Sequence, residues 1–548
     1  MVTEIELKYS ILEDNELATS EQIQTQINLL LSKHTLVFSH KEKQLSNYYF
    51  DTTDLALRKS KIALRTRGTK SSGEDERFEQ TIKTSGTVIA GLHQRPEYNV
   101  DIDNDKPILD LFPQVIWQPN TDINQLQENI VELFSTHFTR QTWLVTIDNS
   151  EVEIAFDCGE ISCDGQVEKP RIYEIELELV SGNTQVLFVL TKILFSQLNL
   201  RPGHLTKAAR GYALYHEGLT EKHVITKLTK NKNIINKTSK EHTLVDYPKS
   251  SVSIIKLLKN HSINEAFTNG IASILTQLQL SVDGYVEASS TDRLSKLNKV
   301  SELLALLRQG FWIFKEQLTD EQIALRSELS YFIRTIHWVE HAYYIQLLIN
   351  KKSSYQKEAS VSQALITKLQ LTQNSYPSES QVLAILHSER FNLLQLDLLS
   401  LLLKVTEGNN AIELESFSLV NFSAKQLTNS TKALNDELAQ LTQPENSSST
   451  ELYLTAHSLL IRALLTSSWF SYLFIDLEAD IVTKFNMPWL DMKLGVSELQ
   501  SLTVLRQQLE QLPLTEQKLT QWLNNKSENL VIALDQSRAK SLTMISYW

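Results

Sequence analysis

The most informative residues of this sequence are charged side chains that recur at every second position within short segments. Two segments, TEIELKY near the N-terminus and YEIELEL near residue 175, carry acidic residues at this spacing. Their charged residues are Glu4, Glu6, Lys8, Glu174, Glu176 and Glu178. Because successive side chains of a β-strand point to opposite faces, each set would project from one face of its strand.

Basic side chains recur in further segments of the same kind. They are Arg65 and Arg67 in ALRTR, Lys83 in QTIKT, Arg95 in QRPEY and Arg140 in FTRQT. One charged face on one antiparallel strand commonly faces water. Repetition of charged faces over several strands instead favours a closed barrel, with the charged faces lining its inside.

Such an interior has a definite chemical use. Arginine and lysine side chains bind the nonbridging oxygens of a polyphosphate, arginine through two parallel hydrogen bonds and lysine as a point charge. Carboxylates repel that anion unless a cation lies between them, and Mg²⁺ and Mn²⁺ take carboxylate and phosphate oxygens together. The two sets of residues therefore predict one site for a polyphosphate and a divalent metal.

The elements that would position these residues alternate between strands and short helices up to about Tyr215. The expected strands cover residues 2–9, 44–52, 61–68, 77–84, 92–101, 137–145, 150–158 and 171–180, and eight strands can close a barrel. The expected helices between and after them cover residues 21–32, 122–135, 183–198 and 205–216.

The second half of the sequence has a different character. After a Lys- and Asn-rich segment at residues 222–243, apolar residues recur at helical spacing from about Ser262 onward. We therefore predict an α+β fold: an N-terminal eight-stranded antiparallel β-barrel with flanking helices, then an all-α helical bundle. The expected domains are residues 1–216 and 251–548, with residues 217–250 as a linker.

Composition limits the possible partners and the compartment. A chain of 548 residues is long enough for several domains, and a net charge of −12 disfavours a general binder of nucleic acid or anionic membrane. The apolar stretch Leu452–Ile475 contains His457 and Arg462, which favours a buried bundle helix over a membrane span. Two cysteines, Cys158 and Cys163, and a charged N-terminus predict reduced thiols in a cytoplasmic protein.

The charged segments also carry a family resemblance. MVTEIELKY resembles the ExExK signature of the CYTH superfamily, the triphosphate tunnel metalloenzymes, and the segments LRTR, IKT, RPEY, FTR, AFDCG and EIELEL follow in the family's order. HLTKAARGY resembles the closing helical segment of the family, and the resemblance covers about residues 1–216. It implies a tunnel in which Mg²⁺ or Mn²⁺ is bound by glutamates and a triphosphate by basic residues.

The resemblance assigns roles residue by residue. The implied metal ligands are Glu4, Glu6, Glu174 and Glu176, with Glu178 or Asp157 as additional ligands. The implied phosphate-binding residues are Lys8, Arg65, Arg67, Lys83, Arg95, Arg140 and Lys207. The expected catalytic residues are Glu176 and Lys83. A lysine of lowered pKa, with Lys83 as one candidate, would accept the proton of the attacking water, and the alternative is that a bound metal activates this water.

Three functions follow from this resemblance. The first is an inorganic triphosphatase that hydrolyses tripolyphosphate. The others are an adenylate cyclase of the CYTH type and a non-catalytic polyphosphate-binding protein, while thiamine triphosphatases also share the tunnel. The sequence alone leaves the group attached to the triphosphate open.

The helical half resembles the CHAD family of polyphosphate-binding helical domains, and a CYTH domain followed by a CHAD domain resembles bacterial tripolyphosphatases. The segments concerned are LSKLNKVSELLALLRQGFWIF and AHSLLIRALLTSSWFSYLF, and most of the family's arginines are missing from them. Their retained polar residues are Lys296, Lys299, Arg308, His457 and Arg462. Polyphosphate is the partner implied here, and the alternative is that His457 and Arg462 are residues at the edge of the core whose polar ends reach water.

One further motif, HWVEH at His337–His341, has the H-x-x-E-H spacing of inverted zinc peptidases. No third ligand at a suitable position is evident, and short motifs of this kind arise readily by chance. We therefore expect ordinary surface or core histidines on a bundle helix.

Overall fold

The computed structural model describes residues 2–12, 19–71, 73, 75–89, 92–119, 121–203, 205–216, 253–289, 292–350, 356, 362–407, 418–439, 449–477, 479–510 and 517–548. The chain divides into two compact units. The first comprises Met1–Ser239 with His387–Ser400, and the second Lys240–Leu386 with Leu401–Trp548. The predicted linker, residues 217–250, lies outside the described residues.

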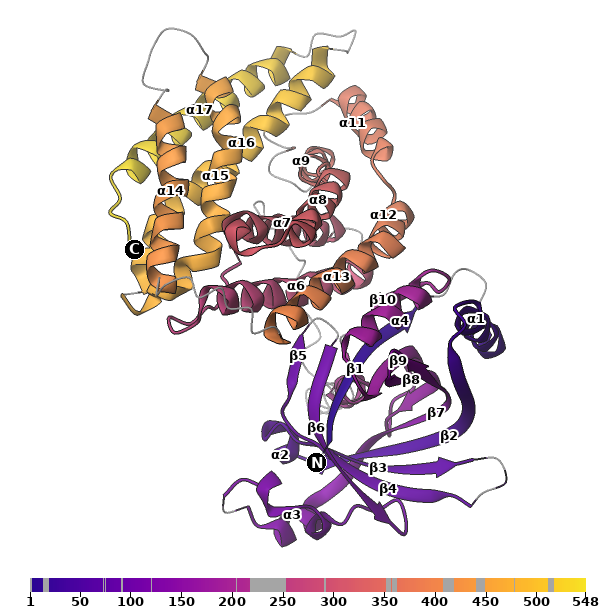
Figure 1. Ribbon diagram of the computed structural model, residues 1–548. Helices are drawn as coiled ribbons and strands as arrows, with labels where there is room; N and C mark the ends of the chain where they lie inside the picture. Colours follow the sequence, from indigo (N-terminus) through magenta and orange to yellow (C-terminus); the bar gives the residue numbers. More distant parts are fainter. Residues whose placement is uncertain are drawn as a thin grey trace, which may run out of the picture. The chain divides into compact units, whose positions relative to one another are not determined.

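The first unit contains a closed antiparallel β-barrel (Figure 1). Its ring of eight strands is β1 (Val2–Ile11), β9 (Arg171–Ser181), β8 (Ser150–Ser162), β7 (Ile130–Ile147), β2 (Val37–Thr52), β3 (Ala63–Lys70), β4 (Arg77–Lys83) and β6 (Leu92–Ile102). The ring closes because β1 pairs with both β9 and β6. Two short strands, β5 (Thr87–Ile89) and β10 (Leu200–Pro202), pair with β6 and β1. The predicted eight-stranded barrel is confirmed.

Helices flank the barrel as expected. They are α1 (Ser20–Lys33), α2 (Ala56–Lys59), α3 (Ile123–Asn129), α4 (Gln185–Phe195) and a helix at residues 207–216, with 3₁₀ turns η1 (Leu109–Leu111) and η2 (Gln114–Ile116). Helix α1 begins with a capping box in which Thr19 and Gln22 bond each other's backbone N–H. Helix α4 is almost entirely apolar and contacts β8, β9 and α1, so it covers the outer, apolar face of these strands.

The helix predicted over residues 122–135 is wrong in its second half. Helix α3 ends at Asn129, and β7 begins at Ile130 and pairs with β2 along its whole length. The reason is burial: Leu133 and Phe134 are 4% and 1% exposed within an apolar cluster that includes Tyr49 of β2. Tertiary pairing of an apolar, aromatic segment thus outweighs its local helical spacing.

The register of the strands determines which charged side chains meet. Directly opposed residues of antiparallel neighbours point to the same face. Glu6 of β1 lies opposite Glu178 of β9, and Lys8 lies opposite Glu176. On the other side of β1, Glu4 lies opposite Arg95 of β6. The first strand therefore brings acidic and basic side chains together inside the barrel.

The helix at residues 207–216 is fitted closely against the barrel wall. A Cβ atom added to Gly211 would lie 2.1 Å from the Phe134 ring, so only glycine allows this approach. The Tyr212 ring packs edge-on against Phe134 at 5.2 Å, and its hydroxyl lies 3.4 Å from the Asp51 carboxylate. These contacts fix the position of the helix that carries Lys207.

In the described residues, everything from residue 253 onward is helix or connection, which confirms the predicted all-α half. The helices are α6 (Ile263–Glu287), α7 (Arg293–Ile313), α8 (Asp320–Thr335), α9 (Val339–Ile349), α11 (Gln363–Ser375), α12 (Glu379–Leu386), α13 (Glu389–Glu407), α14 (Leu419–Ala439), α15 (Ser449–Phe470), α16 (Ala479–Glu510) and α17 (Gln517–Leu542), with 3₁₀ turns η3 (Lys315–Gln317) and η5 (Ser471–Leu477). Trp469 of α15 is fully buried, lies over Gly270 and Gly310, and donates to the Leu306 carbonyl at 3.1 Å.

One helical stretch, Thr450–Ile475, is long and apolar enough to cross a membrane, and 56% of its apolar window is buried within the protein. Tyr453 and Leu460 on this stretch are 0% and 1% exposed. This burial fits the expectation of a core bundle helix.

The unit that holds the barrel also includes His387–Ser400, the first part of α13. Within this unit, Asn392 donates to the Leu200 carbonyl of β10 at 2.5 Å. Lys192 of α4 pairs with Asp397 at 2.7 Å. Residues far along the sequence thus form polar contacts with β10 and α4 within this unit.

Candidate functional site

A cavity of about 280 Å³ lies inside the barrel and is lined mainly by charged side chains. Its lining residues are Glu4, Glu6, Lys8, Tyr49, Ala63, Arg65, Arg67, Thr81, Lys83, Arg95, Glu97, Asn99, Arg140, Glu176, Glu178, Thr206, Lys207 and Ala208. Seven of these are lysine or arginine and five are glutamate. All seven predicted phosphate-binding residues therefore face one cavity, which excludes the interpretation of separate solvated faces.

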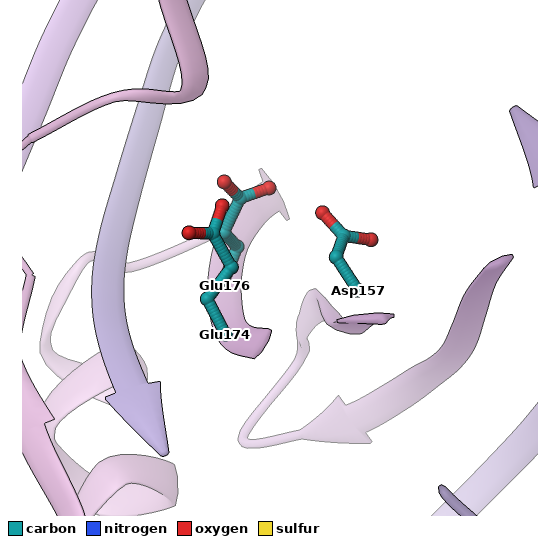
Figure 2. A group of neighbouring side chains, drawn as sticks. All are labelled: Asp157, Glu174 and Glu176. Atoms are coloured by element: carbon teal, nitrogen blue, oxygen red, sulfur yellow. The ribbon is translucent and has the colours of Figure 1, made fainter. Parts of the chain in front are cut away.

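Three carboxylates on adjacent strands β8 and β9 form the most compact acidic group of the described residues. Asp157, Glu174 and Glu176 each offer an oxygen, and these atoms lie within 4.8 Å of one another. Figure 2 shows Glu174 and Glu176 extending from one strand with the Asp157 carboxylate beside them. The group has the oxygen donors that a hard cation prefers.

Basic side chains already hold this acidic group. The Lys207 ammonium pairs with Asp157 at 2.6 Å, with Glu176 at 2.9 Å and with Glu174. Lys8 pairs with Glu174 at 2.5 Å and with Glu176 at 3.0 Å. Four basic residues serve the three carboxylates, and they are Lys8, Arg140, Lys207 and Arg210.

The electrostatics of the group follow from these contacts. Burial alone would raise the pKa of Glu176, but Lys207, Lys8 and Arg140 hold the pKa of Glu176 well below its ordinary value. Burial likewise opposes ionisation of Asp157, yet Arg140 and Lys207 lower its pKa. These carboxylates are therefore ionised and already neutralised by their neighbours.

Glu6 and Glu178 are in the opposite situation. Both are largely buried and face each other across β1 and β9, and among the described residues neither makes an ion pair. Burial, with repulsion from Glu176 and Glu4, raises the pKa of Glu6 to about 8. Burial, with repulsion from Glu4, raises the pKa of Glu178 to about 7. Burial and the neighbouring carboxylates therefore disfavour the charged forms of Glu6 and Glu178.

Lys83 lies between two of the glutamates that line the cavity. Its ammonium lies 2.5 Å from the Glu4 carboxylate and 3.2 Å from Glu97. Burial would lower the pKa of Lys83, but Glu4 and Glu97 raise it above its ordinary value. The prediction that Lys83 has a lowered pKa is therefore wrong for this arrangement, because its acidic neighbours stabilise the charged form.

The arginines of the cavity differ in how they are held. Arg140 makes a bidentate pair with Asp157 at 2.7 Å and a further bond to Glu176. Arg65 lies 3.6 Å from Glu97. Among the described residues, the Arg67 side chain donates only to a neutral group, the Asn47 carbonyl oxygen, at 2.7 Å. Burial, with repulsion from Arg65 and Arg140, lowers the pKa of Arg67 to about 10.

Sequence reasoning missed two residues that act on this site. Arg210 bonds Glu174 at 2.5 Å and lies three residues after Lys207 on the same helix, a spacing that could have been recognised. Asn47 is a neutral residue in a strand, and no charge or motif distinguishes it before the fold is known.

In the helical unit, the expected basic residues separate into two groups. Lys299 bonds Ser253 at 2.7 Å, and the half-buried ring of His457 lies 3.4 Å from Gln500. Arg308, in contrast, lies within a group of like charges. Burial, with repulsion from Arg326, Arg334 and Arg462, lowers the pKa of Arg308. The guanidinium of Arg462 also lies over the Trp312 ring at 5.0 Å.

The HWVEH segment makes no metal site within the described residues. His341 bonds the Tyr376 hydroxyl, and the exposed His337 ring bonds the Arg334 carbonyl at 2.5 Å. In the part of the chain that the structure describes, Asp157, Glu174 and Glu176 form the one group of three potential ligands whose atoms all lie within 4.8 Å of one another. Cys158 and Cys163 are free thiols.

The part of the chain that carries this site is similar to known proteins. Residues 3–212 match the family model described as "CYTH domain". The chain is 38% identical over 220 residues to the inorganic triphosphatase of Haemophilus influenzae. That match covers 39% of this chain and 55% of the relative, so the chain spans about half the length of this curated relative.

Two solved structures give weaker similarities. A putative adenylyl cyclase from Hippeastrum, described as having a dominant triphosphatase activity, is 17% identical and has a TM-score of 0.29; it covers 39% of this chain and 96% of its own. A CHAD domain from Ricinus communis is 16% identical and has a TM-score of 0.38; it covers 54% of this chain and 96% of its own.

Proposed function

We propose that residues 3–212, which match the model of the CYTH domain, form a metal-dependent triphosphatase that releases phosphate from tripolyphosphate. The cavity inside the barrel is the observation that carries the proposal, because it combines seven basic with five acidic side chains. A site that only bound a polyanion would be weakened by five glutamates. A hydrolase that holds the anion together with divalent cations requires both signs.

The donor set fits a hard divalent cation, Mg²⁺ or Mn²⁺. Glu4, Glu6 and Glu178 supply carboxylate oxygens that line the cavity from two adjacent strands. The pKa values of Glu6 and Glu178 are raised because burial and the neighbouring carboxylates outweigh the attraction of the nearby lysines, and a divalent cation would offset this cost of ionisation. We assign the metal to these three residues together with Glu176. Binding of the ion would require their carboxylates to approach one another, because among the described residues only Asp157, Glu174 and Glu176 offer oxygens that all lie within 4.8 Å. Glu174, also expected as a ligand, accepts from Lys8, Lys207 and Arg210 in this structure.

The phosphate groups belong on the arginines of the cavity lining, which lie beside the glutamates. Arg65 and Arg67 extend from β3, Arg95 from β6 and Arg140 from β7. Guanidinium groups bind phosphate oxygens bidentately and stay charged when buried. Lys83 lies between Glu4 and Glu97, so its ammonium can bind a phosphate oxygen next to the metal ligands.

The reaction then depends on positioning and charge. When bound, a divalent ion at the glutamates neutralises negative charge on the phosphate oxygens and lowers the pKa of a bound water. The arginines hold the substrate in line and stabilise charge that develops on the leaving group. Lys83 contributes as a positive charge, because its raised pKa keeps it protonated near neutral pH. Glu176 contributes by holding Lys8, Arg140 and Lys207 in place beside the metal.

The size and lining of the cavity favour an inorganic substrate. Its volume of about 280 Å³ lies below the range of roughly 300–1,000 Å³ for pockets of drug-sized ligands. Tyr49 is the only aromatic side chain among the lining residues, and it stacks on Phe134. An adenylate cyclase or thiamine triphosphatase would need further surface to hold an adenine or thiamine ring.

Phosphate release tests the proposal. The purified chain is assayed with Mg²⁺ or Mn²⁺ on tripolyphosphate, ATP, thiamine triphosphate and pyrophosphate, with EDTA as the metal-free control. We expect tripolyphosphate to be hydrolysed at least tenfold faster than the others and EDTA to abolish the activity. Cyclic AMP formed from ATP would establish the cyclase instead, and binding without hydrolysis would establish a non-catalytic polyphosphate-binding protein.

We propose polyphosphate as a second ligand, at the arginine group of the helical unit formed by Arg308, Arg326, Arg334 and Arg462. The lowered pKa of Arg308 supports this, because it records four like charges brought together from α7, α8 and α15. Long polyanions bind such summed positive fields in a salt-dependent way. Replacing Arg308 and Arg462 by alanine should weaken polyphosphate binding at least tenfold, whereas Arg506→Ala on α16 should not; equal binding by both variants would refute this site.

We also propose a cytoplasmic location, which the two free thiols support. Thiol-specific labelling of the protein freshly released from cells should modify both cysteines. Recovery of either cysteine in a mixed disulfide under those conditions would contradict a reducing compartment.

A further inference from the structure

Arg67 differs from the neighbouring arginines of the barrel cavity in the group that its guanidinium contacts. Arg65 and Arg140 are both held by carboxylates, Glu97 and Asp157 respectively. Within the described residues, no acidic side chain lies within ion-pair distance of Arg67. Its single side-chain bond goes from Nε to the Asn47 Oδ1 atom, at 2.7 Å. The positive charge of Arg67 is thus held in place without being neutralised.

Asn47 lies at the centre of a row across three strands. In the register of the barrel it is opposite Arg67 of β3 on one side and Thr136 of β7 on the other. Its side chain is 0% exposed, and its Nδ2 donates to the Thr136 hydroxyl at 2.9 Å. That hydroxyl accepts from the amide nitrogen, so the carbonyl oxygen must turn toward Arg67.

The bonding leaves a specific part of Arg67 available. With Nε engaged, the Nη1 and Nη2 groups keep their hydrogens for a ligand, and this edge suits two oxygens of one phosphate. An aspartate has nearly the same shape as asparagine, but it would form an ion pair with the guanidinium and compete with the phosphate. The neutral amide orients the guanidinium and does not compete.

We propose that Asn47 is a positioning residue, which aligns Arg67 by a neutral hydrogen bond so that its charge remains available to a phosphate group of the substrate. This inference rests on the proposed binding of a triphosphate in the barrel. It adds to that proposal a residue that touches no substrate and sets affinity through Arg67.

Calorimetric titration of tripolyphosphate into the intact chain, in EDTA and then with Mg²⁺, tests this directly, together with kcat and KM for phosphate release. Asn47→Asp should weaken binding and raise KM at least tenfold while changing kcat less than about threefold. Thr136→Val, which removes the bond that orients the amide, should raise KM by about threefold. Thermal unfolding of each variant establishes that it is folded.

Asn99→Asp is the charge-matched control, since it adds the same negative charge to the lining of the same cavity. It should raise KM less than Asn47→Asp does. Equal effects of the two aspartates, or wild-type affinity in Asn47→Asp, would overturn the inference. The test of the proposed function is separate from this one. A wild-type chain that binds tripolyphosphate without hydrolysing it refutes the proposed hydrolysis, and the affinities of the variants still decide the role of Asn47. A wild-type chain that binds no tripolyphosphate overturns both.

Discussion

Replacing Glu6 by glutamine should stabilise the metal-free barrel at high pH. The Glu6 carboxyl is 9% exposed, and burial together with Glu176 and Glu4 raises its pKa from 4.5 to about 8. A carboxyl whose pKa is raised by folding contributes full stability below its unfolded pKa and loses it as the pH rises through its folded pKa. The metal-free protein should therefore lose stability between about pH 5 and pH 9.

The magnitude follows from the size of the shift. At about 1.4 kcal/mol for each pKa unit, Glu6 titrating alone would cost the folded state about 5 kcal/mol at pH 9. Glu6 shares its charge interactions with Glu176 and Glu4, so we expect roughly half of this, about 2–3 kcal/mol. Glutamine has the same shape and no charge, and should remove the loss. With saturating Mg²⁺ the wild-type protein should be more stable than Glu6→Gln. The reason is that the wild-type protein keeps the Glu6 carboxylate and so gains the full binding energy of the metal.

Hydrogen exchange of the β1 and β9 amides, followed by mass spectrometry in EDTA at pH 6 and pH 9 and corrected for intrinsic exchange rates, measures the stability of the barrel separately from the helical unit. Glu160→Gln is the matched control, because Glu160 is on β8 and exposed and pairs with Lys169. Equal protection of the native barrel at both pH values would refute the reasoning. So would a pH-dependent loss that Glu6→Gln leaves unchanged.

Three other substitutions test the surroundings of the site. Gly211→Ala would place a Cβ atom 2.1 Å from Phe134 and should lower barrel stability by about 1–3 kcal/mol. In the control Gly284→Ala in α6, the added Cβ atom meets nothing nearer than 3.8 Å, so this change should be neutral or slightly stabilising. Equal shifts of the melting temperature in the two variants would contradict the close fit at Gly211. Lys207→Met should lower the melting temperature in EDTA, because Asp157, Glu174 and Glu176 lose a shared cation, and Mg²⁺ should restore part of the loss; an unchanged melting temperature would count against the network. Asn28→Leu removes the acceptor of the fully buried Trp143 indole and should cost about 1–3 kcal/mol in urea unfolding, and no loss would show that Trp143 does not need this partner.

The barrel could be predicted because charge alternates at period two in segments that the fold places side by side. TEIELKY and YEIELEL each separate charged from apolar faces, and the register pairs them as β1 and β9. The short strands β5 and β10 have three residues each, too few for a periodic pattern, and were missed. Residues 130–135 were predicted as helix because their apolar spacing fits either period, and only pairing with β2 decides between them.

The sequence identifies basic residues that line the cavity, but not which carboxylate each of them pairs with. The basic residues could be found from their types, and the fold brings all of them to one cavity. Which carboxylate each base neutralises depends on register and side-chain reach. For this reason, the sequence could not separate Glu174, which is held by three bases, from Glu178, which has a raised pKa. The charge state of Lys83 likewise depends on Glu4 and Glu97, which come from different strands.

The central claim is that one barrel cavity holds a divalent metal at the glutamates and a triphosphate at the arginines. The most direct measurement is a crystal structure of the chain with Mn²⁺ and tripolyphosphate at a pH that slows turnover, with anomalous scattering used to locate the metal. We predict anomalous density between Glu4, Glu6 and Glu178, and phosphate groups on Arg65, Arg67 and Arg140. Manganese bound elsewhere, or a cavity that stays free of phosphate at saturating tripolyphosphate, would contradict the account.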